Sequence, residues 1–422
     1  MKRTSSAIII AALSGTLAGP PAFPQSADFP TDDPFALDDA GALSWQADIG
    51  LVLLVGDTPS DDVTLLGDAE LGVEFETFTD MGRRWGLVLS GRAERDLRPD
   101  VQGGRVGNCP AGSGDCATVG QPGAAASPIA SDSGLYSAGN GSGDRVRGMI
   151  SEAYVFMDTG WGEARVGYGP GAARLDPVGG PAAGRLVRAD GGHLLAAPRL
   201  AIRTETVHSG HDPKLVFRSI ALGQESTIGT FRLAASFTPE ARQCGVDFCP
   251  RQTLSGGQLG AINENISELA VTWEVRRGEH EWAISLATSH AGRVQAIVGF
   301  EPISGLDAGL SWRWQDWRAG GRWRRSNNGV SGSGDYEAFS ASLGWEQGDW
   351  LTTIEYAAYS DDFIHSDGSV WQTGASRLVG DHGLVAFGLQ TAESREPQSL
   401  VGGRLQIEDR RAMGFVELGW RY

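Results

Sequence analysis

The sequence predicts an all-β fold, a transmembrane antiparallel β-barrel of sixteen strands. Three observations predict it. Apolar and polar residues alternate with a period of two in many short segments, which gives each segment one apolar and one polar face. The connections between these segments alternate between long ones and turns of a few residues. Tryptophans gather beside the short turns, as expected at a boundary between lipid and water.

The clearest strand is Asp68–Glu76, DAELGVEFE. Its apolar residues occupy every second position and face one way, whereas its carboxylates and glycine face the other way. Ser151–Ala173 shows the same alternation on both sides of a turn at Thr159-Gly160, so it holds two strands and a glycine-rich exit. An apolar face on every strand needs an apolar environment, and the rest of the chain favours lipid.

The remaining strands follow the same rule and pair as hairpins across turns such as Gly278-Glu279. Val294–Glu301 is also apolar but is assigned to a loop, and the alternation is weakest in Lys214–Ile220 and Val370–Leu378. In chain order the predicted strands are Leu43–Val55, Asp68–Glu76, Arg84–Arg95, the two within Ser151–Ala173, Lys214–Ile220, Thr230–Thr238, Glu268–Arg276, Glu281–Ser289, Leu306–Trp314, Trp317–Ser326, Tyr336–Glu346, Trp350–Ser360, Val370–Leu378, Leu384–Thr391 and Met413–Tyr422.

Three connections are long: Leu97–Arg147, Gly169–Asp212 and Pro239–Asn265. Loops of this length are unusual in a compact soluble domain but ordinary on the outer side of a membrane barrel. A soluble sandwich or propeller is not expected to separate its connections so regularly into long and short sets. A closed barrel also pairs every backbone N–H and C=O inside lipid.

The tryptophans give an independent argument for a membrane interface. An indole ring is apolar while its N–H stays hydrated, so it prefers the level of the lipid head groups. Core packing in a soluble protein is the alternative, but a core does not require tryptophans at one end. Those close to short turns are Trp85, Trp161, Trp273, Trp282, Trp314, Trp317, Trp345 and Trp350.

The first residues resemble a secretory signal. Lys2 and Arg3 precede a short apolar run, Ala7–Ala18, which is too short for a membrane-spanning helix. Cleavage after Ala18, Ala22 or Ala27 is compatible with this segment. Residues 1–27 are predicted to be the signal peptide, residues 28–42 an acidic lead-in, and residues 43–422 the barrel.

Composition restricts the class of partner. The formal net charge is −17, which disfavours nucleic acid, because nucleic-acid binding needs a basic surface. The 60 glycines are spread along the 422 residues, so they indicate neither collagen nor a low-complexity linker.

Four cysteines allow three disulfide connectivities. Cys109 with Cys116 and Cys244 with Cys249 are the easiest ring closures in an oxidising compartment. Metal ligation is the alternative, but no CxxC spacing and no neighbouring histidine supports it.

Three features resemble a Gram-negative general porin of the outer membrane, of the type common in alphaproteobacteria. Glu152–Ala173 resembles the porin hairpin that leads into the constriction loop. The C-terminal segment MGFVELGWRY, Met413–Tyr422, resembles the terminal signal that the outer-membrane assembly machinery reads. The third feature is the alternation of long and short connections over the whole mature chain.

This resemblance implies a homotrimer in the bacterial outer membrane, in contact with its lipid and inserted by the barrel assembly machinery. It implies passive diffusion of small hydrophilic solutes and ions through a water-filled channel, with no enzymatic activity and no cofactor. A solute-specific channel for a sugar or an anion is the first alternative, and a barrel-anchored adhesin or receptor is the second. No Ser/His/Asp ordering supports a lipase or protease barrel.

In such porins the third outer loop folds into the lumen and sets acidic residues against wall arginines. By resemblance this constriction loop is Gly169–Asp212. The acidic candidates in it are Asp176, Asp190 and Glu205, and the wall candidates are Arg84, Arg92, Arg165 and Arg218. The loop departs from the family pattern because it also carries Arg174, Arg185, Arg188, Arg199 and Arg203. Alternation assigns further lumen-lining positions to Glu94, Glu152, Glu163, Arg318, Arg322 and Arg324.

Two loop clusters contain residue types that bind cations. His208, His211 and Asp212 could hold a metal ion, but a solvated loop end is expected there, and no metal site is predicted. A calcium ion at the rim, bound by Asp57, Asp61 and Asp62, is a weaker alternative to a solvated loop.

Overall fold

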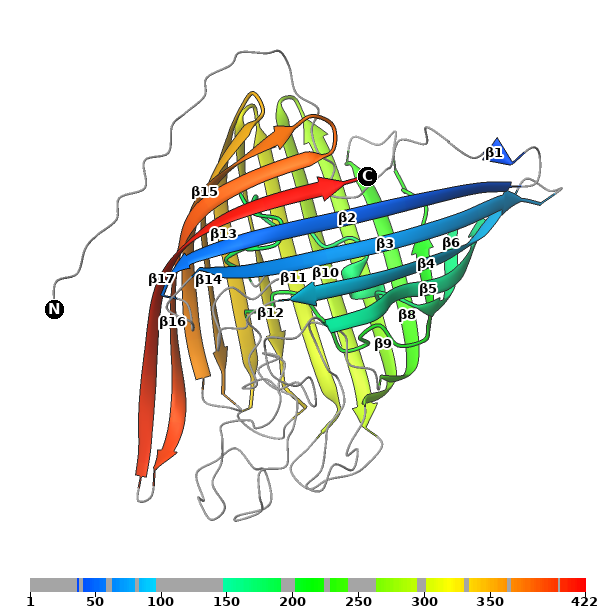
Figure 1. The fold of residues 1–422 in the computed structure, drawn as a ribbon. Helices are drawn as coiled ribbons and strands as arrows, with labels where there is room; N and C mark the ends of the chain where they lie inside the picture. Colours follow the sequence, from blue (N-terminus) through cyan, green and yellow to red (C-terminus); the bar gives the residue numbers. More distant parts are fainter. Residues whose placement is uncertain are drawn as a thin grey trace.

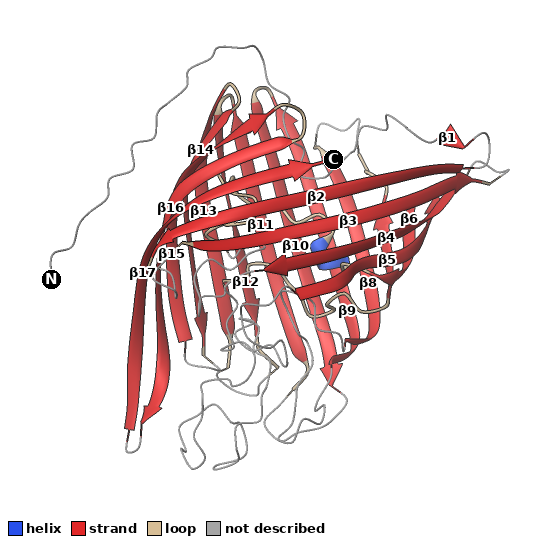
Figure 2. Cartoon of the chain, viewed as in Figure 1, coloured by secondary structure: helices blue, strands red, loops and turns tan. Residues whose placement is uncertain are grey.

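The chain forms a closed antiparallel barrel of sixteen strands, seen from the side in Figures 1 and 2. The computed structural model describes residues 36–37, 41–57, 63–79, 83–95, 147–190, 202–223, 228–241, 263–293, 301–329, 334–362, 366–400 and 403–422. The strands are β2 (Gly41–Gly56), β3 (Thr64–Phe78), β4 (Arg84–Arg95), β5 (Arg147–Thr159), β6 (Gly162–Tyr168), β7 (Lys214–Ser219), β8 (Thr230–Ala241), β9 (Asn263–Arg277), β10 (His280–Arg293), β11 (Ile303–Trp314), β12 (Trp317–Ser326), β13 (Tyr336–Gln347), β14 (Trp350–Asp361), β15 (Ser366–Val379), β16 (Gly383–Leu400) and β17 (Gly403–Arg421).

Each strand pairs with the next along the chain, and β17 pairs with β2 to close the wall. A two-residue strand, β1 (Ala36–Leu37), adds to the start of β2. The predicted signal peptide lies outside the described residues. The wall begins at Gly41, within two residues of the predicted start of the barrel.

All sixteen predicted strands overlap one observed strand each, so the predicted fold class is confirmed. The largest difference is at β16 and β17, which are predicted as Leu384–Thr391 and Met413–Tyr422 but extend much further and project beyond their neighbours in Figure 1. Arg395 there forms ion pairs with Asp367 and Glu408, so charge replaces the apolar alternation that identified the other strands. Most of Val294–Glu301 lies outside the described residues.

The outer face of the wall is apolar and exposed. In β2, Leu51 and Leu53 are 46% and 39% exposed, whereas Val52 and Leu54 between and beyond them are fully buried. The same alternation recurs around the barrel, for example at Leu286 in β10 and Leu310 in β11. A continuous apolar exterior of this kind suits lipid rather than water.

The short turns are built by residues that adopt a left-handed backbone. Gly278 (φ 62°) joins β9 to β10 and Gly348 (φ 60°) joins β13 to β14, and glycine takes this conformation without steric cost. The turn between β5 and β6 falls at Gly160-Trp161, one residue later than predicted. The short turns joining β11 to β12, β13 to β14 and β15 to β16 lie at the end of the barrel that also holds the C-terminus (Figure 1).

Aromatic side chains gather at this end. Trp45 at the start of β2 stacks on Tyr422 with ring centroids 4.5 Å apart, and Trp282, Trp312 and Trp314 lie against one another between β10 and β11. Of the eight predicted tryptophans, Trp85, Trp161, Trp282, Trp317, Trp345 and Trp350 are exposed large side chains.

The described residues include one 3-10 helix, Ala172–Arg174, inside the barrel. No helix in the described part of the chain is long and apolar enough to cross a membrane.

Candidate functional site

The segment between β6 and β7 folds into the barrel and follows its inner wall. Its described parts are residues 169–190 and 202–213. The N–H of Val178 donates to Ser285 Oγ on β10 (3.1 Å), and the N–H of Ala183 donates to Glu355 on β14 (3.0 Å). The N–H of Leu186 reaches Glu417 on β17 (3.1 Å). The inward-folded loop predicted from the sequence is therefore present.

Buried carboxylates on the wall hold the backbone of this loop. Glu417, which is fully buried, accepts N–H groups from Arg185, Leu186 and Val187. Hydrogen bonds to an ionised acceptor are stronger than those between neutral groups, and three of them fix a turn of the loop in place.

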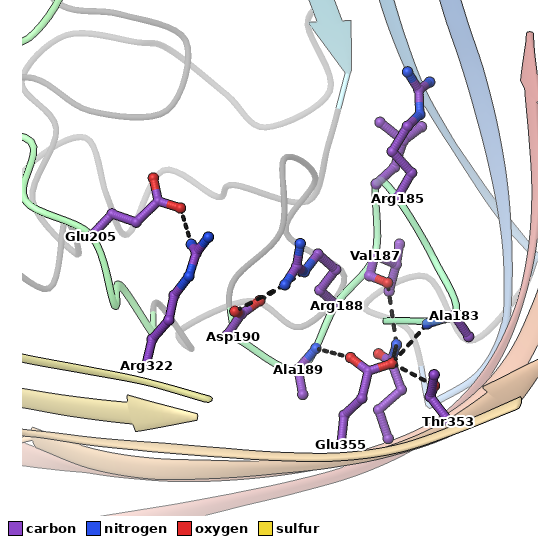
Figure 3. Close-up of polar contacts among 12 residues, drawn as sticks. Ala183, Arg185, Val187, Arg188, Ala189, Asp190, Glu205, Arg322, Thr353 and Glu355 are labelled. Carbon is purple, nitrogen blue, oxygen red and sulfur yellow. Dashed lines mark hydrogen bonds and ion pairs between the residues drawn. The ribbon is translucent and has the colours of Figure 1, made fainter. Parts of the chain in front are cut away.

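Glu355 makes a second attachment, drawn in Figure 3. It accepts N–H groups from Ala183 (3.0 Å) and Ala189 (3.3 Å), and Thr353 donates its hydroxyl to the same carboxylate (2.8 Å). The loop therefore reaches Glu417 and returns to Glu355.

The outgoing and returning arms have attachments of their own. Near the start of the loop, Glu268 accepts the N–H of Ala173 (3.4 Å). Near its end, Asp307 accepts the N–H of Thr206 (3.1 Å). Four wall carboxylates on β9, β11, β14 and β17 thus bind loop N–H groups.

Glycines on the inner wall make room for the loop. A Cβ atom at Gly309 would lie 2.0 Å from the carbonyl oxygen of Val178, and one at Gly320 would lie 2.7 Å from the Cα of Gly180. Any larger residue would push the loop backbone away from the wall. Further inner-wall glycines in contact with the loop are Gly50, Gly305, Gly344 and Gly374.

Two wall arginines meet acidic residues of the loop. Arg218 on β7, a wall candidate in the sequence, donates through Nε to Asp176 Oδ2 (2.8 Å) and forms a second contact with Oδ1. Arg322 on β12 pairs with Glu205 and also donates through Nε to the carbonyl of Val178 (2.9 Å). The sequence predicts Arg322 only as a lumen-lining residue, whereas in the structure it contacts the loop.

The other predicted constriction residues have different partners. Asp190 pairs with Arg188 of the same loop. In the described residues, Arg84 pairs with Asp158 (2.7 Å), Arg92 with Asp68 (2.7 Å) and Arg165 with Glu163, all within the wall.

The predicted lumen-lining residues separate into covered and exposed groups. Arg324 is fully buried behind the loop, where its guanidinium lies 5.4 Å from the ring centroid of Tyr336, and Glu94 is 1% exposed. Glu152 and Glu163 remain partly exposed, and Arg318 is partly exposed and pairs with Glu346.

The expectation of a solvated loop end at His208–Asp212 was wrong. His208 and Asp212 are buried, because the end of the loop packs onto the wall. His208 Nδ1 is 3.0 Å from Ser289 Oγ and its Nε2 is 3.3 Å from Arg324, while His211 Nδ1 lies 2.9 Å from the carbonyl of Ser151. Arg324 is an obligate donor, so Nε2 of His208 is the acceptor and Nδ1 carries the proton. The part of the chain that the structure describes contains no group of three residues able to hold a metal ion.

Other predicted sites fall on residues that the structure does not describe. Cys109, Cys116, Cys244 and Cys249 all lie outside the described ranges, as do Asp61 and Asp62. Asp57 is described, and its carboxylate accepts the N–H of Ala412 (3.3 Å).

The charges around the loop are arranged differently from the expected acidic loop and basic wall. A loop arginine, Arg185, pairs with a wall carboxylate, Asp48. On β3 and β5, Glu70, Glu74 and Glu152 are partly exposed and form no ion pair with any described residue. The interior wall on this side is therefore acidic.

Arginines dominate the surroundings of Glu205. Burial on its own would raise the pKa of this carboxyl, but the positive charges of Arg322, Arg174 and Arg188 outweigh burial and lower its pKa to about 2. The pKa of Arg188 is raised, chiefly by Asp190.

Sequence patterns alone did not single out the wall carboxylates and inner-wall glycines as attachment points of the loop. Each lies at an inward position of its strand, but Glu417 has the bulky inward neighbour Phe415 and Glu268 has Ile266, so small neighbours do not distinguish them.

Comparisons with known proteins support the fold. No protein-family model matches the chain, and no curated protein matches it by sequence. Among solved structures, an anion-selective porin from Comamonas acidovorans is 13% identical (TM-score 0.51), covering 90% of this chain and 100% of that one. OmpT, an outer membrane protein of Vibrio cholerae in a trimer form, is 11% identical (TM-score 0.52; 91% and 100%). OmpF of Salmonella typhi, in complex with daunomycin, is 9% identical (TM-score 0.51; 92% and 99%). At these identities the likeness establishes a shared barrel architecture.

Proposed function

We propose that this chain is an outer-membrane porin, a water-filled channel for passive diffusion of small hydrophilic solutes and ions. The observation that carries the proposal is the loop fixed inside a closed barrel by wall carboxylates such as Glu355 and Glu417. A loop attached in this way narrows the lumen permanently, and narrowing a pore with fixed charges on opposite sides is how a channel selects by size and charge.

The outer surface supports a membrane location. Exposed leucines such as Leu51 and Leu310 alternate with inward residues along the strands, and an aromatic group including Trp45 and Tyr422 lies at the end with the short turns. An apolar band bordered by aromatic residues is the arrangement that lipid requires of a β-barrel.

The interior supports a polar permeation path. The ion pair of Arg322 with Glu205 lies at β12, and the carboxylates Glu70, Glu74 and Glu152, which form no ion pair with any described residue, lie across the barrel on β3 and β5. Opposed fixed charges orient water and raise the barrier for apolar solutes, while small polar solutes pass. The mechanism involves no bond breaking, so no enzymatic activity is proposed.

The same proposal includes three further points: the protein is a homotrimer, it is inserted by the barrel assembly machinery, and it is a general porin of the alphaproteobacterial type. The trimer form named for the Vibrio cholerae protein supports the first of these by analogy of fold. A solute-specific channel of the same fold is the second candidate, favoured by the arginines of the loop. The adhesin or receptor alternative lacks a feature in the described residues that favours it.

Planar-bilayer recording on the purified full-length protein tests the proposal. We expect large ohmic conductance steps in KCl, grouped in threes if the protein is a trimer. Small steps blocked by micromolar solute would favour the solute-specific channel. A protein that migrates as a folded, heat-modifiable barrel on a gel yet gives no conductance would contradict both.

The Asp176→Asn variant sharpens the test. Removing this loop carboxylate should reduce the permeability of K⁺ relative to Cl⁻, whereas Asp381→Asn, in the exposed turn between β15 and β16, should leave the ratio unchanged. Equal ratios in the two variants would show that the loop does not border the ion path.

A further inference from the structure

Three guanidinium groups converge on one loop carboxylate. Arg322 of β12 pairs with Glu205, Arg174 Nε lies 3.7 Å from Glu205 Oε2, and Arg188 is close enough to act on the same charge. Arg174 lies near the start of the loop, Arg188 in its middle and Glu205 near its end, while Arg322 belongs to the wall. These residues come together only when the loop is folded against the wall. Figure 3 shows Glu205, Arg322 and Arg188 on the inner side of the curved wall.

Two of these arginines also have direct acidic partners. Arg188 is also paired with Asp190, through Nε (3.0 Å) and Nη2 (3.2 Å). Asp190 thus pairs directly with Arg188, and Glu205 pairs directly with Arg322. The next wall carboxylate, Glu355, accepts N–H groups of the loop, and its charge also acts on Arg188.

Arg188 and Arg322 also have N–H donors that no described residue accepts. A guanidinium has five N–H donors. Arg322 uses Nε for the carbonyl of Val178 and Nη1 for Glu205, and Arg188 uses Nε and Nη2 for Asp190. In the described part of the chain, Nη2 of Arg322 and Nη1 of Arg188 donate no hydrogen bond. Both side chains are partly exposed, at 11% and 25%, so a solute in the lumen reaches them.

Carboxylates on the opposite wall of the barrel favour an anionic solute at the arginine cluster. Glu70, Glu74 and Glu152 repel an anion from β3 and β5, so an anionic solute in the same lumen is favoured at the arginines. The depressed pKa of Glu205 agrees with a positive potential here.

We propose that Arg188 and Arg322, with Arg174 beside them, form a binding station for an oxyanion group, a carboxylate or a phosphate, carried by solutes that cross the channel. The inference rests on the proposed channel function and adds the chemical class of a preferred solute to it. Arginine is suited to this role because its planar fork matches two oxygens of a carboxylate or phosphate.

The test measures single-channel conductance of the purified protein in KCl while inorganic phosphate, or in a parallel series acetate, is titrated into one chamber. For the wild type we expect a saturable fall in conductance. Arg188→Gln and Arg322→Gln should each raise the half-saturating concentration about tenfold, the effect of losing one charge-assisted hydrogen bond. Saturation by both anions assigns the station to oxyanions in general, and saturation by phosphate alone assigns it to phosphate.

Two further variants separate this effect from damage to the fold. Glu205→Gln removes a competing carboxylate, so it should lower the half-saturating concentration and move the response in the opposite direction. Arg313→Gln removes a wall arginine that pairs with Glu346 outside the cluster and should leave the response unchanged. Each variant is first shown to be a heat-modifiable barrel.

The outcomes distinguish the two proposals. A wild type without conductance overturns the channel function itself. Ohmic conductance with the same phosphate response in the wild type, Arg188→Gln and Arg322→Gln overturns the oxyanion station and leaves the channel standing. A non-saturating response in the wild type likewise overturns the station.

Discussion

Lys214 Nζ lies 2.5 Å from the carbonyl oxygen of Gly169, so the first residue of β7 contacts the first residue after β6. The same ammonium donates to the carbonyls of Gly210 (3.0 Å) and Asp212 (2.8 Å). An ammonium has three N–H donors, and here all three reach the backbone. Lys214, which is 4% exposed, therefore ties both ends of the loop together.

Lys214→Met should loosen the base of the loop. The substitution keeps the length of the side chain but leaves three carbonyl groups without their donor, at about 1–3 kcal/mol for each one that water does not reach. We expect a lower unfolding temperature and larger fluctuations of the open-channel current. Arg232→Gln, which removes a charge from the exposed pair with Glu274, is the matched control and should behave as the wild type. Equal current noise in both variants would contradict the role of Lys214.

Glu417→Ala should release the far end of the loop. Its carboxylate accepts the N–H groups of Arg185, Leu186 and Val187, so the change removes every one of these contacts at once. We expect a loss of several kcal/mol in the free energy of unfolding and a change in single-channel conductance as the loop leaves β17.

Glu408 supplies the control for this prediction because it lies on the same strand but is exposed and pairs only at the surface. Glu408→Ala should change the free energy of unfolding by no more than about 1 kcal/mol. If urea titrations give the same loss for both variants, Glu417 does not carry the attachment.

The barrel could be predicted from the sequence because its physical cause is local. Alternation at a period of two, as in Asp68–Glu76, needs no knowledge of other strands, and turn residues such as Gly278 and Gly348 mark the ends of hairpins. The extensions of β16 and β17 escaped this reasoning because their faces carry charge, so no apolar period reveals them.

The site could be predicted only in part. The expected opposition of loop acids and wall arginines names Asp176 and Arg218 as candidates on the two sides, but it does not indicate that these two residues pair. The attachments of the loop to the wall could not be predicted. The hydrogen bond from Leu186 to Glu417, for example, joins residues 231 positions apart. Its acceptor is a carboxylate that binds backbone N–H groups, so no complementary charge in the loop indicates it. Arg84 pairs with a wall residue and not with the loop, because Asp158 on the adjacent strand β5 lies within ion-pair distance of it.

Gly309→Ala should displace the loop from β11. The added Cβ would lie 2.0 Å from the carbonyl oxygen of Val178, far inside van der Waals contact, so the loop backbone has to move into the lumen. We expect a smaller single-channel conductance and reduced stability, of about 1–3 kcal/mol for overpacking. Gly148→Ala is the control, since its nearest neighbouring atom would be 3.7 Å away, and unchanged conductance is expected there. The same conductance in both variants would argue against close packing of the loop on Gly309.

The stability that Glu205 contributes should depend on pH in a defined window. Arginine charges lower the pKa of Glu205 in the folded barrel to about 2 from an ordinary value of 4.5. A lowered folded pKa means that the unfolded chain binds the proton more readily, so the contribution is complete above pH 4.5 and is lost as the pH falls toward 2. Its upper limit is about 3 kcal/mol, and partial exposure of the side chain to the lumen reduces it.

The difference in unfolding free energy between the wild type and Glu205→Gln isolates this group, because the other titrating residues are common to both proteins. Urea titrations in lipid vesicles should give a constant difference from pH 7 to about pH 5, and a difference that falls steadily below that. A difference that already falls between pH 7 and pH 5 would mean that the carboxyl of Glu205 titrates near or above its ordinary range. The guanidinium groups of Arg174, Arg188 and Arg322 would then not act on it as the structure indicates.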